Sequence, residues 1–355
     1  MKTCPNTLNI IKKHRFLRFP FLRIAATAFA IAAFSLAGTQ ASDGGYLFAT
    51  FKGESPTGEQ IYFALSRDGR TWSALNKSKP VLISEIGTSG VRDPYIIRLE
   101  GENKFVLLAT DLSIYKKRLE TGNGVETWKQ AVQSGSRSLV IWESTDLVKW
   151  EGPRLVQVAP EDAGCAWAPE AIYDSEAGDY LVFWASTTPA TGFKKHRILA
   201  SRTKDFREFT PAVPFIDEST GVIDTTIVKD GGLYYRFSKN ETRKEIVMET
   251  SEKLAGPWKE ITEFTLRGIP GIEGPECYPL KLQDTNGQKT WCLIADAYAK
   301  SLGYQPYTTQ SLSSGIFTKA EDFSFPFKFR HGCVLPVSEE EYQRLEKTFG
   351  VEIKH

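Results

Sequence analysis

Short runs of β-branched and aromatic residues recur along the chain and alternate with polar turns. Four turn segments share one plan, in which small polar residues are followed by a polar turn and then by an aromatic residue. These segments are 66–72, 144–150, 201–209 and 251–258, with a weaker fifth copy at 313–323. Two strand-like runs precede each of the four segments. The recurrence, at a spacing of roughly 50 to 80 residues, predicts a repeated unit built from β-strands.

The two ends of the chain carry incomplete repeats that complement each other. A further strand precedes most of the strand pairs, but none precedes the run at 46–48, and the strand-like run at 332–337 has no partners after it. If 332–337 completes the first repeat, the count becomes five sheets of about four strands each. Closure of this kind also removes exposed sheet edges. We therefore expect an all-β fold, a five-bladed β-propeller closed by the C-terminal strand, with a β-sandwich as the alternative.

Helical signals are scarce in this pattern. One segment, 338–349, has the features of a helix, with Ser338 as the N-cap and Glu341 at the third helical position. The segment 113–137 lies between two strands of one blade and is polar and glycine-containing. We expect it to be a loop that contributes to a binding rim and to the sites for a leaving group.

The first 41 residues carry the features of an export signal. Basic residues between positions 12 and 23 precede an apolar run at 24–36, which is too short to span a bilayer comfortably, and small residues follow at positions 39 and 41. We predict a secretory signal peptide at 1–41, a single catalytic domain at 42–355, and a secreted or periplasmic protein without membrane attachment after cleavage. An uncleaved anchor is the alternative.

The charge balance argues against some classes of partner. The chain has 44 basic and 43 acidic residues and a net charge of +1, so no single sign of charge marks a nucleic-acid or membrane-surface footprint. A neutral partner such as a glycan fits this balance. The cysteines after the predicted signal match no zinc motif and are either disulfide-bonded or buried thiols; they are Cys165, Cys277, Cys292 and Cys333.

The candidate chemistry lies at the starts of the inner strands. In a propeller the first strand of each blade lines the central channel, so residues at the five strand starts converge near the axis. Three carboxylates, a tryptophan and a histidine would meet there. The five starts are Arg92-Asp93-Pro94, Trp167-Ala168-Pro169, Ile223-Asp224-Thr225, Glu273-Gly274-Pro275 and Arg330-His331-Gly332.

These motifs resemble those of glycoside hydrolase family 43. The order Asp-Pro, Trp-Ala-Pro, Ile-Asp and Glu-Gly-Pro, one motif per blade, is similar to that family over about residues 45–345. The segment 330–337 is similar to the last blade of the family. The related β-fructosidase family shares the propeller, but its Asn-Asp-Pro-Asn type of motif is not matched by the sequence at 92–95.

The resemblance implies roles for three carboxylates. Asp93 would be the general base that activates water, Glu273 the general acid, and Asp224 the group that tunes the pKa of the acid. Inversion at a glycosidic carbon requires an acid and a base roughly 6.5–9.5 Å apart, so that a water molecule fits between them. A third carboxylate near the acid raises its pKa, because like charges disfavour ionisation. Glu276 competes with Glu273 for the channel-facing position.

Three further residues are candidates for substrate binding. Trp167 is expected to stack on a sugar ring, or else to be a core aromatic residue. His331 resembles the axial histidine of the family, which often lies beside a bound calcium ion or a water cluster. No cofactor is required and no metal ligands are assigned, although a structural calcium at the propeller centre is an option; calcium prefers oxygen ligands. Asp111 is expected either to bind substrate or to act as a turn residue.

The expected function is that of an inverting glycoside hydrolase. It would remove α-L-arabinofuranose or β-D-xylose from plant polysaccharides such as arabinan or arabinoxylan, or from related oligosaccharides. Alternatives within the enzyme class are an endo-arabinanase and a β-D-galactofuranosidase. A non-catalytic glycan-binding propeller and a protein-interaction scaffold are the alternatives from other classes.

Overall fold

The computed structural model describes residues 44–122, 124–281 and 287–352. All of them belong to one compact unit, 41–355. The predicted signal peptide at 1–41 lies outside the described residues, so it stays a prediction. Within the described part of the chain, no helix has the length and apolar character needed to cross a bilayer.

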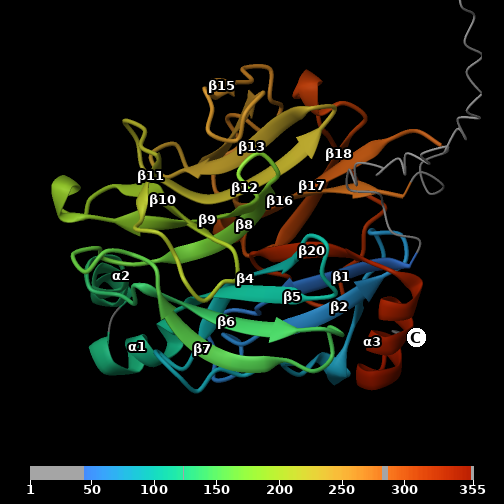
Figure 1. Cartoon of the computed structure of the whole chain (residues 1–355), viewed down its shortest axis with the longest axis horizontal. Coiled ribbons are helices and arrows are strands. Elements are labelled where there is room, and N and C mark those ends of the chain that lie inside the picture. The colour runs from blue at the N-terminus through green and yellow to red at the C-terminus, as the bar shows by residue number, and fades with distance from the viewer. Residues whose placement is uncertain (1–43, 123, 282–286, 353–355) are drawn as a thin grey trace, which may run out of the picture. The chain divides into compact units, whose positions relative to one another are not determined.

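Five four-stranded antiparallel sheets surround a central axis as the blades of a propeller (Figure 1). The inner strand is named first in each blade. Blade 1 comprises β20 (Gly332–Val337), β1 (Gly45–Thr50), β2 (Tyr62–Ser66) and β3 (Ser73–Ala74), and blade 2 comprises β4 (Val91–Arg98), β5 (Phe105–Asp111), β6 (Ser138–Ser144) and β7 (Glu151–Gln157). Blade 3 comprises β8 (Trp167–Asp174), β9 (Asp179–Thr187), β10 (His196–Thr203) and β11 (Val213–Ile216). Blade 4 comprises β12 (Val222–Asp230), β13 (Leu233–Asn240), β14 (Glu245–Ser251) and β15 (Lys259–Glu260), and blade 5 comprises β16 (Glu273–Leu280), β17 (Thr290–Asp296), β18 (Tyr304–Thr309) and β19 (Thr318–Lys319).

Blade 1 joins the two ends of the domain. β20 pairs antiparallel with β1, so that Gly45 lies opposite Val337 and Thr50 lies opposite Gly332. The C-terminal strand thereby supplies the inner strand that the N-terminal repeat lacks. This pairing confirms the predicted closure of the propeller, and the β-sandwich alternative is wrong.

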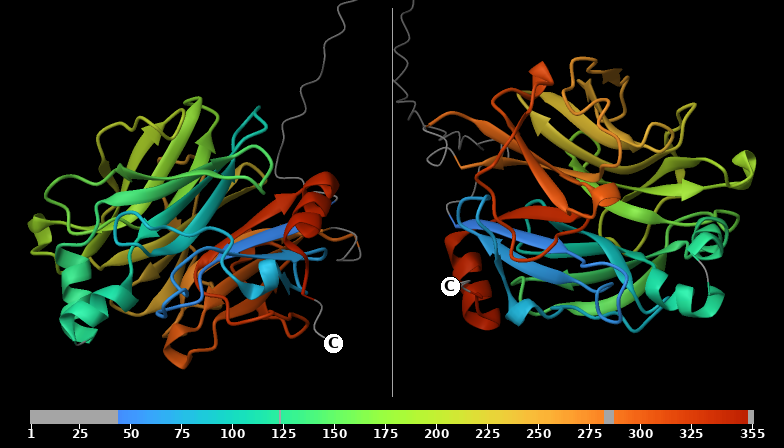
Figure 2. Two further views of the ribbon diagram at one scale, coloured as in Figure 1. Left: turned by 90° about the horizontal axis from the view of Figure 1, so that it is seen from below. Right: turned by 180° about the vertical axis from the view of Figure 1, so that it is seen from behind.

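The predicted C-terminal helix is present as α3 (Glu339–Phe349). Ser338 caps it, and its hydroxyl accepts a hydrogen bond from the Glu341 backbone N–H, while the Glu341 side chain accepts one from the Ser338 N–H. This reciprocal arrangement is a capping box. The helix packs on blade 1 through Tyr342 and Leu345, which share a buried cluster with Leu47 of β1. Figures 1 and 2 show it beside that blade.

The segment 113–137 is not the loop that we expected from its polarity. It contains two helices, α1 (Ile114–Thr121) and α2 (Gly124–Gln133), which contact each other. The Ser113 side chain caps α1, and Gly122, with a φ of 74°, ends it. α2 buries Thr127 and Ala131. The serine cap and the glycine stop were the sequence signals of this hairpin, and the polar composition of α1 masked them.

The repeated turn has a common physical basis in three blades. In the first, the Ser66 hydroxyl accepts a hydrogen bond from Gly69 N–H, and the Asp68 carboxylate accepts hydrogen bonds from the N–H groups of Arg70 and Thr71. The same Ser/Thr-x-Asp arrangement recurs at 144–149 and at 203–208. The fifth copy begins at Thr309, whose hydroxyl accepts from Ser311 N–H, rather than at 313 as the sequence pattern suggested.

The core is divided into layers between neighbouring blades. β5 shows the reason, because its side chains alternate between the two faces of blade 2. Phe105 and Leu107 join the cluster shared with blade 1, whereas Val106 and Leu108 join the cluster shared with blade 3. Further clusters fill the spaces between blades 3 and 4, between 4 and 5, and between 5 and 1. Every blade is therefore held on both faces.

The cysteines that follow the predicted signal are free thiols. All four are buried, and Cys333 lies in β20, where its sulfur accepts a hydrogen bond from Ile96 N–H at 3.0 Å. The thiol alternative is confirmed and the disulfide alternative is wrong. The ring is therefore closed by backbone pairing and packing.

We predict that Leu47→Ala lowers the free energy of unfolding by about 2–4 kcal/mol, because it removes a fully buried side chain from the closing blade. Leu155→Ala is the matched control, since Leu155 lies on an outer strand and is 43% exposed. Urea denaturation followed by circular dichroism measures both. Equal effects of the two substitutions would contradict a core that depends on the closing blade.

Candidate active site

The inner strands of blades 2 to 5 share one irregularity at their starts. In each of these inner strands, the pairing register with the second strand shifts within the three-residue motif at the strand start. Such a shift marks a β-bulge. The second residue of the motif is left-handed in all four strands: Asp93 (φ 49°), Ala168 (47°), Asp224 (51°) and Gly274 (54°). A non-glycine residue in this conformation costs about 1–3 kcal/mol. The bulges therefore give the four blades a common backbone shape at the mouth of the channel.

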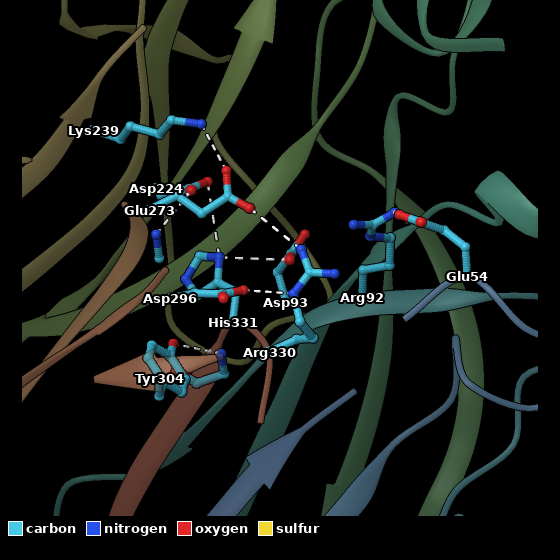
Figure 3. Close-up of polar contacts among 12 residues, drawn as sticks. Glu54, Arg92, Asp93, Asp224, Lys239, Glu273, Asp296, Tyr304, Arg330 and His331 are labelled. Carbon is cyan, nitrogen blue, oxygen red and sulfur yellow. Dashed lines mark hydrogen bonds and ion pairs between the residues drawn. The ribbon is translucent and has the colours of Figure 1, made fainter. Parts of the chain in front are cut away.

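The bulge in β16 separates the two glutamates that competed in the sequence. Glu276 is 5% exposed, and its Oε1 accepts a hydrogen bond from Val334 N–H at 2.7 Å. Glu273 instead lies among the charged side chains at the strand starts (Figure 3). Of the two, the structure brings Glu273 together with Asp224.

His331 lies at the centre of this group. Its Nδ1 is 3.5 Å from Asp93 Oδ1 and 3.8 Å from Asp224 Oδ1 (Figure 3). Burial lowers the pKa of His331, but the two carboxylates outweigh this effect and raise it to about 9. His331 is therefore an imidazolium at neutral pH, held between two carboxylates that come from different blades.

Gly274 allows His331 to occupy this position. A Cβ atom at residue 274 would lie 2.7 Å from His331 Cγ, which is closer than van der Waals contact permits. The positive φ of Gly274 also disfavours any other residue. The Glu-Gly-Pro motif therefore requires its glycine for both conformation and space.

Asp93 is held as a carboxylate. The Thr110 hydroxyl donates to its Oδ2 at 2.9 Å and accepts a hydrogen bond from Ala168 N–H at 2.7 Å, which orients the hydroxyl proton toward Asp93. Burial raises the pKa of Asp93, but the hydrogen bond and charge of His331, with the charge of Arg92, outweigh it and hold the pKa below its usual range.

Asp224 differs from Asp93 in its proton affinity. Burial raises its pKa to about 6, with repulsion from Glu273 and Asp93 acting in the same direction and attraction to His331 and Lys239 opposing it. Asp224 Oδ2 accepts a hydrogen bond from Gly274 N–H at 3.1 Å. Asp224 is thus linked through the backbone to the residue that follows Glu273.

Two cations contact Glu273. Lys239 Nζ lies 2.6 Å from Oε2, and an Arg330 nitrogen lies 3.4 Å from Oε1. Lys239 is only 4% exposed, and it also contacts Glu241 at 2.8 Å. The buried ammonium group is therefore compensated by two carboxylates, as a buried charge must be.

Sequence reasoning missed Lys239 and Asp296. Asp296 is fully buried, lies opposite Glu273 in the β16–β17 register, and binds Arg330 Nε at 2.5 Å. Both residues lie near the ends of second strands, beside the starts of inner strands. Antiparallel pairing places the end of each second strand beside the start of the inner strand. A position at the end of a second strand was therefore the sequence signal that could have identified both residues, as it identified Asp111 at the end of β5.

Asp111 has a different set of contacts from the other carboxylates. It is 3% exposed, and its Oδ1 accepts hydrogen bonds from the backbone N–H and the hydroxyl of Thr88 at 2.8 and 2.9 Å. These bonds hold the loop before β4. Its role in substrate binding stays a prediction.

Trp167 is half-buried at the start of β8. Its ring lies 5.1 Å from the ring of His196 and 6.1 Å from the ring of Trp128 of α2. Arg92 lies 5.6 Å from the Trp128 ring. Trp167 is therefore part of an aromatic group beside the carboxylates, and its contact with a sugar stays a prediction.

His331 itself is not placed as a calcium ligand. Calcium takes about six to eight oxygen ligands, whereas His331 Nδ1 is a protonated donor that faces two carboxylates. In residues 44–122, 124–281 and 287–352, no group of three or more His, Cys, Asp or Glu side chains is arranged to hold a metal ion. The structural calcium at the propeller centre stays a prediction.

Comparison with known proteins identifies a matching family. Residues 42–343 match the model of a family related to glycoside hydrolase family 43, described as a probable glycosyl hydrolase domain. The chain is 28% identical over 367 aligned residues to an alpha-L-arabinofuranosidase of Bifidobacterium longum subsp. longum. The alignment covers 84% of this chain and 34% of that protein, so the chain spans about a third of the length of this relative.

Solved structures share the fold at low sequence identity. An exo-β-1,3-galactanase from Clostridium thermocellum has a TM-score of 0.53 and 13% identity, covering 79% of this chain and 62% of that one. A glycoside hydrolase family 43 protein from Bacillus licheniformis has a TM-score of 0.50 and 15% identity, covering 81% and 55%. At these identities the likeness concerns the fold alone.

We predict that neither His196 nor His331 titrates between about pH 5 and 8. Burial lowers the pKa of His196 to about 4, so it stays neutral, whereas the pKa of His331, at about 9, keeps that ring charged. Long-range ¹H–¹⁵N NMR of the imidazole rings measures both states, and His331→Gln assigns the charged signal. A midpoint near 6.5 for His331 would contradict the arrangement described above.

Proposed function

The chain belongs to the family of probable glycosyl hydrolase domains related to glycoside hydrolase family 43, and from this membership we propose that it is an inverting glycoside hydrolase that removes a terminal pentose, α-L-arabinofuranose or β-D-xylose. The observation that carries the proposal is the meeting of Asp93, Asp224 and Glu273, from three blades, around His331 (Figure 3). Because their surroundings differ, the three carboxyl groups can take different roles.

Asp93 is the proposed general base. Its lowered pKa keeps it ionised at neutral pH, so it is ready to take a proton from the attacking water. The Thr110 hydroxyl donates a hydrogen bond to Oδ2, and His331 contacts Oδ1. These two contacts fix the orientation of the Asp93 carboxylate. Because Asp93 is a weak base, its contribution to the reaction comes from its fixed position beside the attacking water.

Glu273 is the proposed general acid, which donates its proton to the departing glycosidic oxygen. Lys239 and Arg330 fix the position of its two oxygens, and Asp224 fixes the following residue through the Gly274 N–H. Asp224, with a pKa of about 6, is a second proton-holding group beside the acid near neutral pH.

The proposed substrate is a terminal arabinofuranose or xylose on a plant polysaccharide such as arabinan or arabinoxylan. The relative from Bifidobacterium longum, an alpha-L-arabinofuranosidase, supports arabinofuranose over xylose. The cations near the site are paired with carboxylates, which suits a neutral sugar. Export to the periplasm or the medium, which the N-terminal signal features predict, would place the enzyme where such glycans occur.

We predict that Asp93→Asn and Glu273→Gln each lower kcat/KM by at least about 10²-fold on an unactivated glycoside, because each removes a proton-transfer group. Glu161→Gln, at a side chain that is 83% exposed, is the control and leaves turnover unchanged. Hydrolysis is measured on α-L-arabinofuranosides, β-D-xylosides and β-D-galactofuranosides, with the product anomer followed by proton NMR.

A second substrate separates the two roles. An aryl glycoside with a dinitrophenolate leaving group needs no acid, so Glu273→Gln should lose little activity on it, whereas Asp93→Asn should lose activity on both substrates. Near-normal turnover of Glu273→Gln on the unactivated glycoside would refute the assignment of the acid. Binding of glycans without turnover by the wild-type protein would favour the non-catalytic alternative.

We also predict that Lys239→Met raises the pKa of Asp224, because the Lys239 ammonium group favours the ionised form of that carboxyl group. Carbon-13 NMR of the aspartate carboxyl groups measures this pKa, and Asp224→Asn assigns the signal. Lys244→Met is the matched control, because exposed Lys244 contacts the other oxygen of the same partner, Glu241. An Asp224 pKa that moves equally in both variants, or in neither, would contradict this role for Lys239.

A further inference from the structure

The α1–α2 hairpin lies on the same side of blade 2 as Asp93. Val91 at the start of β4 lies opposite Asp111 at the end of β5. The chain that leaves β5 therefore emerges beside the start of the inner strand, which is where the candidate active site begins. Helix α2 also contacts β9 of blade 3. The hairpin thus bridges the rim between blades 2 and 3 (Figures 1 and 2).

Trp128 is an exposed aromatic residue on this hairpin. Helix α2 buries Thr127 and Ala131, yet the neighbouring Trp128 is 38% exposed. Its ring makes an edge-to-face contact with Trp167, with centroids 6.1 Å apart and planes at 77°. We name this pair of nearly perpendicular indole rings the tryptophan corner (Trp128 and Trp167).

Both rings of the tryptophan corner have further contacts. His196 stacks against Trp167 at 5.1 Å, and its lowered pKa of about 4, caused by burial, leaves this support uncharged at neutral pH. Arg92 lies 5.6 Å from the Trp128 ring and directly precedes Asp93 in sequence. Arg92 is in turn paired with Glu54 and Glu59, so its charge is compensated.

We propose that the tryptophan corner is a subsite that binds a neutral sugar ring of the glycan from which the terminal pentose is cut. The proposal rests on the function proposed above and deepens it by assigning a leaving-group site. A terminal sugar must lie at the carboxylates around His331, which come from the inner strands. Trp128 comes from a helix added outside the strands, so it meets the next part of the glycan.

The chemistry of the corner suits a sugar. Indole rings present flat apolar faces, and a sugar ring covers such a face with its C–H groups while its hydroxyls stay hydrated. The compensated charge of Arg92 offers no free cation for an acidic residue. A neutral pentose or hexose ring is therefore the ligand class that the corner fits.

The experiment compares two substrates with different leaving groups. We expect Trp128→Ala to lower kcat/KM about tenfold on an arabino-oligosaccharide, which corresponds to loss of one stacked ring face. On an aryl α-L-arabinofuranoside with a single sugar, the same variant should act like the wild type. Trp128→Phe should keep most of the activity on the oligosaccharide. Val125→Ala is the control, because Val125 lies on the same helix, is 83% exposed and should affect neither substrate.

A binding measurement keeps the two proposals distinguishable. Isothermal titration of Asp93→Asn with the oligosaccharide should show about tenfold weaker binding when Trp128→Ala is added. If the wild-type protein hydrolyses neither substrate, the proposed function fails, and this titration still decides the subsite. Equal losses on both substrates, or unchanged oligosaccharide binding in Trp128→Ala, would overturn the tryptophan corner as a leaving-group subsite.

Discussion

The pairing of β20 with β1 supports both the ring and the candidate active site. It joins the last strand of the domain to the first, so each blade packs against two neighbours. His331 directly precedes β20, and the same pairing therefore places the imidazolium at the axis. Without this strand, the cation that lies between Asp93 and Asp224 would have no fixed position. The stability of the fold and the geometry of the site thus share one cause.

Charge compensation is the second constraint on the site. Asp93, Asp224, Glu273 and Asp296 share a buried region in which four negative charges would repel one another strongly. The imidazolium of His331 and the cations of Arg330 and Lys239 offset this repulsion. The compensation is uneven: the pKa of Asp93 is lowered, whereas the pKa values of Asp224 and Asp296 are raised. Neighbouring carboxyl groups of the site therefore differ in their affinity for protons.

The periodic strand pattern is enough to predict the five blades, because alternating side chains fill the spaces between them. The repeated position of the strand starts also predicts that three carboxylates and His331 meet at the axis. The pattern does not identify Lys239, Asp296 or Trp128, because they come from second strands or from an insertion, whose positions depend on pairing register and helix packing. It also misses the two helices of the insertion, because their stability comes from a few buried side chains and from caps.

The four bulged strand starts have a consequence for how such a domain can change. The same left-handed backbone position carries a carboxylate in two blades, a methyl group at Ala168 and no side chain at Gly274. Because the backbone shape is common to these blades, a carboxylate can appear or disappear there by a single substitution without rebuilding a strand. Only Gly274 is fixed, by the nearness of His331. The backbone of such a propeller can therefore stay the same while the reactive side chains at its strand starts change, and the fold and the site can evolve at different rates.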